Sequence, residues 1–233
     1  MSPTRSLGVI RSIELSDVEV VYGGRVRALE VEKLVFSRAF YVVMGPNGAG
    51  KTTLLDVVSG LVLPSRGRVI INDLVNLSGL GGRERAAIRR DHYSYLLQED
   101  IFMDAFSVWD NIALPYRLHG IEVPERRIRE LAELLGIARL LDKRPSSLSS
   151  GERRKASLVR VLSKAPGSSV ILLDEPTSFL DRESVAALLS FMESELQDKI
   201  VIVATHDEAV RKIADYTVKL RGGRVELVEK QSS

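Results

Sequence analysis

The chain has 233 residues, of which 45% are hydrophobic and 27% charged. This balance excludes a disordered or fibrous protein, and no apolar run reaches the roughly 20 residues of a membrane-spanning helix. The lack of cysteine excludes disulfides and thiolate metal sites, and a net charge of +2 gives no reason to expect direct binding to nucleic acid. The opening Met1–Asp17 lacks the apolar core of a secretion signal, so we expect the chain to stay where it is made.

Short β-branched segments predict strands over Ile10–Tyr22, Val26–Phe36 and Arg68–Ile71, separated by turns. Three continuous apolar runs are typical of parallel strands covered on both faces; they are Phe40–Met44, Val170–Leu173 and Ile200–Ala204. Apolar residues at helical spacing predict helices over Arg83–Arg90, Val123–Leu135, Glu152–Lys164 and Glu183–Leu196. The alternation of the two patterns predicts an α/β fold with a three-layer core.

One domain is expected over residues 10–230, with a core of about 10–98 and 166–230. Residues 99–165 show helical patterns without a convincing strand, so we expect them to form an inserted helical subdomain. Near the end, Tyr216–Leu220 and Arg224–Val228 flank Gly222-Gly223, which predicts a hairpin.

A glycine-rich segment lies between the predicted strand ending at Met44 and a helix. Its sequence matches the phosphate-loop pattern G-x-x-x-x-G-K-[ST] with the residues Gly45, Pro46, Asn47, Gly48, Ala49, Gly50, Lys51 and Thr52. Backbone N–H groups of such a loop surround phosphates, Lys51 reaches the outer phosphates, and the Thr52 hydroxyl can bind Mg²⁺. The alternative is a strand-to-helix turn with a chance lysine.

Polar residues also follow the other two buried strands. We expect Asp174 to hold Mg²⁺ through its water shell and Glu175 to polarise an attacking water, because open α/β sheets bind ligands beyond the carboxyl ends of their strands. His206 is placed to reach the terminal phosphate. The alternatives are two acids that cap a loop and a structural histidine.

The order of these motifs resembles that of the ATP-binding cassette (ABC) ATPases over nearly the whole chain. The matching segments are Gly45–Thr53, Gln98, Leu148–Glu152, Asp174-Glu175, Ser178–Asp181 and His206. The resemblance implies a phosphate-loop NTPase core with an antiparallel β-subdomain and a helical subdomain. It also implies a homodimer or pseudo-dimer in which the phosphate loop of one subunit faces the signature segment of the other across MgATP.

The resemblance assigns further residues. Tyr22 matches the aromatic residue that stacks on adenine, Thr53 completes the phosphate loop, and Gln98 matches a glutamine that binds near Mg²⁺ and reports nucleotide state. Asp181 matches a loop that reaches across the dimer. Alternatively, Tyr22 is an ordinary core tyrosine and Gln98 is an exposed glutamine at a strand end. Asp181 could also cap a helix, a role that is compatible with its role in the dimer.

The signature segment contributes Ser149, Ser150, Gly151 and Glu152, and it departs from the family's usual L-S-G-G-Q at two positions. Ser150 adds a β-carbon where backbone approaches phosphate. Glu152 suits a helix N-terminus but brings negative charge close to ATP, so we expect slower turnover, and Glu152→Gln should raise it.

Within the family, Gly81–Gln98 and Ser107–Pro115 resemble the lipoprotein-release, macrolide-efflux and cell-division type. This implies a separate integral membrane permease subunit and a cytoplasmic location, peripheral on the inner face of the membrane. The alternative is a soluble ABC-type ATPase that acts as a switch or assembly factor on protein or nucleic acid.

Two surface features remain open. An apolar cluster could line a groove for a helix of the membrane partner or belong to the subdomain core; it comprises Ile101, Phe102, Met103, Phe106 and Trp109. The basic runs are expected to be solvated helix faces, with anionic lipid headgroups as the alternative; they are Arg89-Arg90, Arg126-Arg127 and Arg153-Arg154-Lys155.

Overall fold

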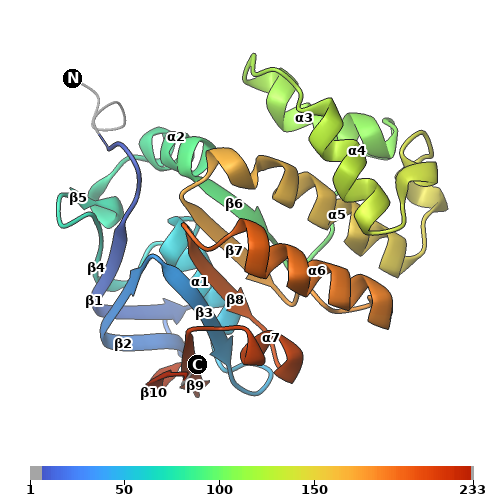
Figure 1. Cartoon of the computed structure of the whole chain (residues 1–233). Helices are drawn as coiled ribbons and strands as arrows, with labels where there is room; N and C mark the ends of the chain where they lie inside the picture. Colours follow the sequence, from blue (N-terminus) through green and yellow to red (C-terminus); the bar gives the residue numbers. More distant parts are fainter. Residues whose placement is uncertain (1–6, 232–233) are drawn as a thin grey trace.

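A computed structural model describes residues 7–231, in which ten strands form one sheet (Figure 1). The first five strands are β1 (Ser12–Tyr22), β2 (Val26–Ser37), β3 (Ala39–Met44), β4 (Arg66–Ile71) and β5 (Val75–Asn76). The other five are β6 (Tyr93–Leu96), β7 (Val170–Asp174), β8 (Ile200–Ala204), β9 (Tyr216–Arg221) and β10 (Arg224–Lys230). Their order across the sheet is β5-β4-β1-β2-β10-β9-β3-β8-β7-β6.

One half of the sheet is parallel and buried on both faces. Strands β9, β3, β8, β7 and β6 run parallel to their neighbours. Successive residues of β7 pack into different cores, with Leu172 in one and Leu173 in the other. Because side chains alternate between the faces of a strand, this places apolar layers on both sides of the sheet. The predicted α/β class and three-layer core are confirmed.

The other half of the sheet is antiparallel. Strand β1 pairs with β2 and β4, and β4 pairs with β5. The predicted hairpin around Gly222-Gly223 is confirmed as β9 and β10, and β10 meets β2 through the pair Arg224 and Glu30. The hairpin therefore joins the antiparallel half to the parallel one.

Within the described residues there are seven α-helices. They are α1 (Lys51–Ser59), α2 (Gly82–His92), α3 (Val108–Leu118), α4 (Glu125–Leu134), α5 (Ser150–Lys164), α6 (Arg182–Glu195) and α7 (Glu208–Lys212). Helices α3, α4 and α5 gather at one end of the molecule (Figure 1). Between β6 and β7 the structure holds helices and no strand, as the patterns predicted, while the division of the chain into core and helical subdomain stays a prediction. No helix of residues 7–231 combines the length and apolar character needed to cross a bilayer.

Four elements were not predicted, namely the helices α3 and α7 and the short strands β5 and β6. Helix α3 continues through Pro115, a residue that normally ends a helix, and β6 is only four residues long. The prediction for Met1–Asp17 rests in part on residues 1–6, which lie outside the described residues.

The register of the parallel strands brings three chain segments to one edge. Ala204 of β8 is level with Val43 of β3 on one side and with Asp174 of β7 on the other. All three strands run the same way, so the residues that follow them emerge together. The phosphate loop, Glu175 and His206 follow these strands, and Asp174 is the last residue of β7.

Candidate active site

In the loop between β3 and α1, two positions have room only for glycine. A β-carbon at Gly45 would lie 2.2 Å from the Leu220 carbonyl oxygen. Gly50 has φ 98°, and a β-carbon there would lie 2.5 Å from the Ala28 carbonyl oxygen. Gly50 is also the N-cap of α1 and supplies no side-chain cap, so N–H groups of the first turn are left to bind an anion.

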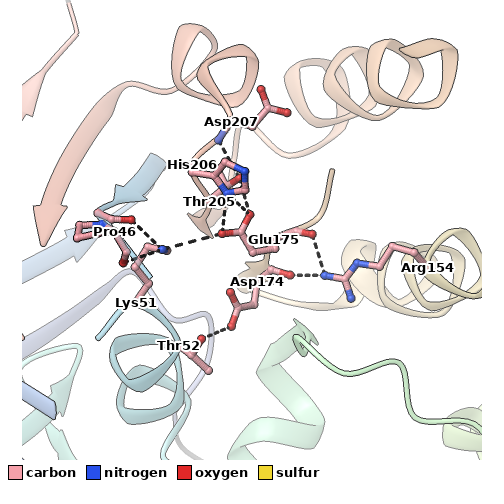
Figure 2. Close-up of polar contacts among 10 residues, drawn as sticks. Pro46, Lys51, Thr52, Arg154, Asp174, Glu175, Thr205, His206 and Asp207 are labelled. Carbon is pink, nitrogen blue, oxygen red and sulfur yellow. Dashed lines mark hydrogen bonds and ion pairs between the residues drawn. The ribbon is translucent and has the colours of Figure 1, made fainter. Parts of the chain in front are cut away.

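Lys51 places its ammonium group at the mouth of this loop. The side chain is largely buried, and Nζ donates hydrogen bonds to the carbonyl oxygens of Gly45 at 2.9 Å and Pro46 at 3.4 Å. Nζ also lies 4.0 Å from Glu175 Oε1 (Figure 2). The cation therefore lies between the loop and the end of β7, where an anion entering the loop would meet it.

Thr52 and Asp174 form the second contact between the loop and β7. The Thr52 hydroxyl donates a 2.6 Å hydrogen bond to Asp174 Oδ2, and Asp174 is 1% exposed. Burial raises the pKa of Asp174, the Thr52 hydrogen bond lowers it, and the neighbouring Glu175 charge raises it again. A buried carboxylate with a raised pKa has too little positive charge around it, which suits it to bind a cation.

Glu175 is held by several contacts in an unusual backbone conformation. Its φ is 46°, in the left-handed region, and its N–H donates to the Ala204 carbonyl oxygen at 2.8 Å. Its Oε2 accepts the Thr205 hydroxyl at 3.0 Å, and Oε1 lies 3.2 Å from Nδ1 of His206, whose side chain is 75% exposed (Figure 2). The carboxylate is thus fixed between Lys51 and His206, which are both cationic when protonated.

Lys51, Thr52, Asp174 and Glu175 border a cleft of about 580 Å³, within the range of small-molecule sites. Its lining residues are Val26, Arg27, Ala28, Asn47, Gly48, Ala49, Gly50, Lys51, Thr52, Thr53, Gln98, Asp174 and Glu175. The phosphate-loop residues 47–53, Gln98 and the two carboxylates therefore meet at one cleft, whereas Gly45, Pro46 and His206 are not among its lining residues. Their roles in catalysis remain predictions.

Several predicted site residues do not line this cleft. Tyr22 lies at the end of β1, paired with Val26, and is 45% exposed, so the alternative of a core tyrosine is wrong. Asp181 caps α6 by accepting the Ser184 N–H at 2.8 Å, which confirms the predicted cap. The signature residues Ser149 to Glu152 lie at the N-terminus of α5, and none of them reaches the cleft.

The signature segment has an internal hydrogen-bond network. Ser149 is the N-cap of α5, and its Oγ accepts the Glu152 N–H at 3.3 Å. Glu152 Oε2 in turn accepts the Ser149 N–H at 2.9 Å and the Ser149 hydroxyl at 2.8 Å. The backbone hydrogen bond from Ser149 holds the pKa of Glu152 below its usual range, and the Ser149 hydroxyl adds to this effect. The hydroxyl of Ser149, a residue of the segment expected to face MgATP across the dimer, is therefore engaged by Glu152.

Glu152→Gln is expected to raise the kcat for ATP hydrolysis about threefold. The substitution removes a negative charge from the segment that is predicted to face the phosphates and weakens the hold on the Ser149 hydroxyl, a change of about 0.6 kcal/mol in the barrier. The Tm should fall by about 2 °C, because a charged residue at the start of α5 interacts better with the helix dipole. Steady-state ATPase assays and thermal melts check both; a marked fall in kcat with unchanged folding contradicts the explanation.

Two residues of the site region escaped prediction. Thr205 is fully buried and orients Glu175, and its position directly before His206 was the available signal. The expectation that Arg153-Arg154-Lys155 is a solvated face is wrong for Arg154, which is 2% exposed. Arg154 precedes Leu158 by four residues and so lies on the apolar face of α5, where hydrogen bonds to backbone carbonyls compensate its burial.

The apolar cluster after Gln98 is divided between surface and core. Ile101, Met103 and Phe106 are exposed, while Phe102 and Trp109 pack against a core. Arg160 lies over the Phe102 ring and Arg129 over the Trp109 ring. The core alternative thus holds for Trp109 and not for Ile101.

The sequence is similar to a known protein family and to several named proteins. A family model described as "ABC transporter" matches residues 33–178. The lipoprotein-releasing system ATP-binding protein LolD of Anaplasma marginale is 32% identical over 91% of this chain and 96% of that protein. The macrolide export ATP-binding/permease protein MacB 1 of Aeromonas hydrophila is 33% identical over 91% of this chain but 34% of that protein.

Solved structures give the same result for the fold. The dimeric structure of MJ0796, described as a bacterial ABC transporter cassette, has a TM-score of 0.86 and 28% identity over 95% of this chain and 99% of that one. A dimeric post-hydrolysis state of the same cassette with ADP and Pi has a TM-score of 0.85 at 28% identity, with the same coverage.

Proposed function

This chain belongs to the ABC transporter family of ATP-binding proteins, and we propose that it is the subunit that binds and hydrolyses MgATP to drive a separate membrane permease. The observation that carries the proposal is the meeting of Lys51, Thr52, Asp174 and Glu175 at one cleft. Phosphoryl transfer to water requires groups that bind the phosphates, hold the metal ion and activate the water. The phosphate loop, the buried Asp174, and Glu175 beside His206 are suited to these three tasks.

The hydrolytic step follows from the placement of Glu175. Water attacks the γ-phosphorus, the bond from that phosphorus to the β–γ bridging oxygen breaks, and ADP leaves with the electron pair. Glu175 accepts the proton of the attacking water, and Thr205 keeps its carboxylate aimed at the cleft. Lys51 and His206 stabilise the negative charge of the terminal phosphate.

The residues at the cleft suit Mg²⁺. Thr52 Oγ1, Asp174 and the Gln98 side-chain carbonyl offer oxygen donors, and Mg²⁺ is held in proteins by one or two carboxylates with waters and phosphate oxygens. Within residues 7–231, no group of three or more His, Cys, Asp or Glu side chains is arranged to hold a metal ion by itself. When bound, Mg²⁺ neutralises charge on the phosphates.

A second copy of the chain completes the site in this proposal. The signature residues lie at the N-terminus of α5, outside the cleft, and this helix end is suited to an anion presented by another subunit. Tyr22 is exposed beside the Val26 end of the cleft and is free to stack on adenine. Asp181 is exposed and reaches the partner from the loop after β7.

The membrane partner is proposed to be a separate subunit, with this chain peripheral on the cytoplasmic face of the membrane. The relative named as the ATP-binding protein of a lipoprotein-releasing system, which this chain matches over 96% of its length, supports this choice. Recovery of an integral membrane protein in a pull-down from native membranes supports the transporter role, and a wholly soluble partner contradicts it.

Nucleotide binding is tested by calorimetry with MgATP on the wild type, Lys51→Ala and a control, Lys33→Ala. Lys51 should contribute charge-assisted hydrogen bonds to phosphate, so its loss should weaken binding about 100-fold. Lys33 is 68% exposed and pairs with Glu14 on the antiparallel half of the sheet, so its variant should bind as the wild type does. Unchanged affinity in Lys51→Ala contradicts the assignment of the phosphate loop.

A further inference from the structure

Arg154 makes an unusual set of contacts for a charged residue. Its side chain is 2% exposed and projects from α5 toward the end of β7 (Figure 2). Nη2 donates to the carbonyl oxygens of Asp174 and, at 2.9 Å, of Glu175. Nη1 donates to the Leu97 carbonyl oxygen and to Asp100 Oδ1, both at 2.9 Å. One buried side chain therefore links three segments of the chain.

The two carbonyls bound by Nη2 lie on either side of the Glu175 α-carbon. Holding both of them fixes the φ and ψ of the residue between them. Glu175 adopts φ 46°, a conformation that costs a side-chain-bearing residue about 1–3 kcal/mol and persists only where surrounding contacts enforce it. Arg154 supplies such contacts, and the Ser178 N–H adds a 3.2 Å hydrogen bond to the Glu175 carbonyl oxygen.

The Nη1 group of Arg154 binds residues on both sides of Gln98. Leu97 directly precedes Gln98, and Asp100 follows it by two residues. The Asp100 carboxylate is 14% exposed and forms an ion pair with Arg154 at 2.9 Å. This pair orients the guanidinium so that its other edge faces the β7 carbonyls.

Helix α5 is joined to the loop after β7 at further points. Lys155 Nζ forms a 2.6 Å ion pair with Asp181. A β-carbon at Gly151 would lie 2.7 Å from the Phe179 carbonyl oxygen, so the first turn of α5 lies directly against this loop. The position of the signature helix is thus tied to the loop that begins with Glu175.

We propose that Arg154 is a positioning residue for the general base, which holds the left-handed backbone of Glu175 and ties it to the signature helix and the Gln98 segment. This inference rests on the proposed role of Glu175. Arg154 does not touch the cleft, so its effect on hydrolysis passes through Glu175.

The test compares Arg154→Gln, Arg154→Lys and Asp100→Asn with a matched control, Arg153→Gln. Arg153 occupies the preceding position on α5 and donates to the Pro145 carbonyl oxygen at 2.8 Å, away from the cleft. We expect kcat to fall about 30-fold in Arg154→Gln, about 10-fold in Arg154→Lys, which loses the planar fork, and about threefold in Asp100→Asn. The affinity for ATP should change less than threefold in all variants, and Arg153→Gln should hydrolyse ATP at the wild-type rate.

A double-mutant cycle with Glu175→Gln separates positioning from general damage. If Arg154 acts through the Glu175 carboxylate, Arg154→Lys should have less than a twofold effect on the residual single-turnover hydrolysis of the Glu175→Gln protein. An equal fall in both backgrounds overturns the proposal, as does wild-type kcat in Arg154→Lys. If Arg154→Gln fails to fold, the Lys and Asp100 variants carry the test.

The outcomes also distinguish this proposal from the proposed function. A wild-type protein that fails to bind or hydrolyse MgATP contradicts the function itself. Normal binding and hydrolysis that do not depend on Arg154 contradict only the positioning role.

Discussion

Glu175→Gln is expected to lower the kcat for ATP hydrolysis by about 10³-fold while leaving the affinity for ATP within about threefold of the wild type. The glutamine cannot take a proton from water, and general-base catalysis contributes about 10²- to 10⁴-fold. Its amide oxygen can still accept the Thr205 hydroxyl, so the shape of the cleft is kept. The charge near Lys51 also falls, which favours binding of the polyphosphate.

The blocked protein should accumulate as an ATP-bound dimer, because we expect the two subunits to separate only after ATP has been hydrolysed. Light scattering coupled to gel filtration measures the dimer, and radiolabelled ATP measures its nucleotide content. Glu183→Gln serves as the control, since Glu183 lies exposed in the first turn of α6 and should leave turnover unchanged. Normal hydrolysis by Glu175→Gln contradicts the assignment of the base, and a strictly monomeric ATP complex contradicts the shared site.

The strands and the phosphate loop could be predicted because their signals are local. A run such as Ile200–Ala204 is apolar throughout because both faces of the strand are covered. The strand can therefore be predicted from these residues alone. The motif that contains Gly45 and Gly50 is also local, although the carbonyl groups that exclude a β-carbon at these positions come from distant segments. Helix α3 was missed because Pro115 signals a break that tertiary packing overrides.

The contacts that depend on distant segments could not be predicted in this way. The pattern of α5 places Arg154 on an apolar face, but only the fold shows that backbone carbonyls from β7 and the Gln98 segment lie there. The capping arrangement of Ser149 and Glu152 follows a local rule and was available from the sequence. Its effect, a signature hydroxyl engaged within its own subunit, becomes visible only in the hydrogen bonds.

Asp174→Asn is expected to change stability in opposite directions with and without ligand. Burial raises the pKa of Asp174 above its ordinary value of 3.8, so the ionised carboxylate destabilises the folded state. The cost is fully present above the raised pKa and disappears as the pH falls through that value toward 3.8. The ligand-free variant should therefore melt about 3 °C above the wild type at pH 7.5, and the difference should shrink in acid.

With ATP present, the order should reverse. Adding Mg²⁺ should raise the Tm of the wild type but not of Asp174→Asn, which lacks the negative charge that attracts the ion, and kcat should fall about 10³-fold. Asp56→Asn is the matched control: its carboxylate accepts the Tyr95 hydroxyl at 2.9 Å, burial raises its pKa too, and it lies outside the cleft. Asp56→Asn should keep the Mg²⁺ response, so a loss of that response in both variants, or its retention in Asp174→Asn, contradicts the role of Asp174. The order of the two Tm values reverses only if the Asp174 carboxylate destabilises the ligand-free protein and is needed to bind Mg²⁺ with ATP. A purely structural aspartate would not produce this reversal.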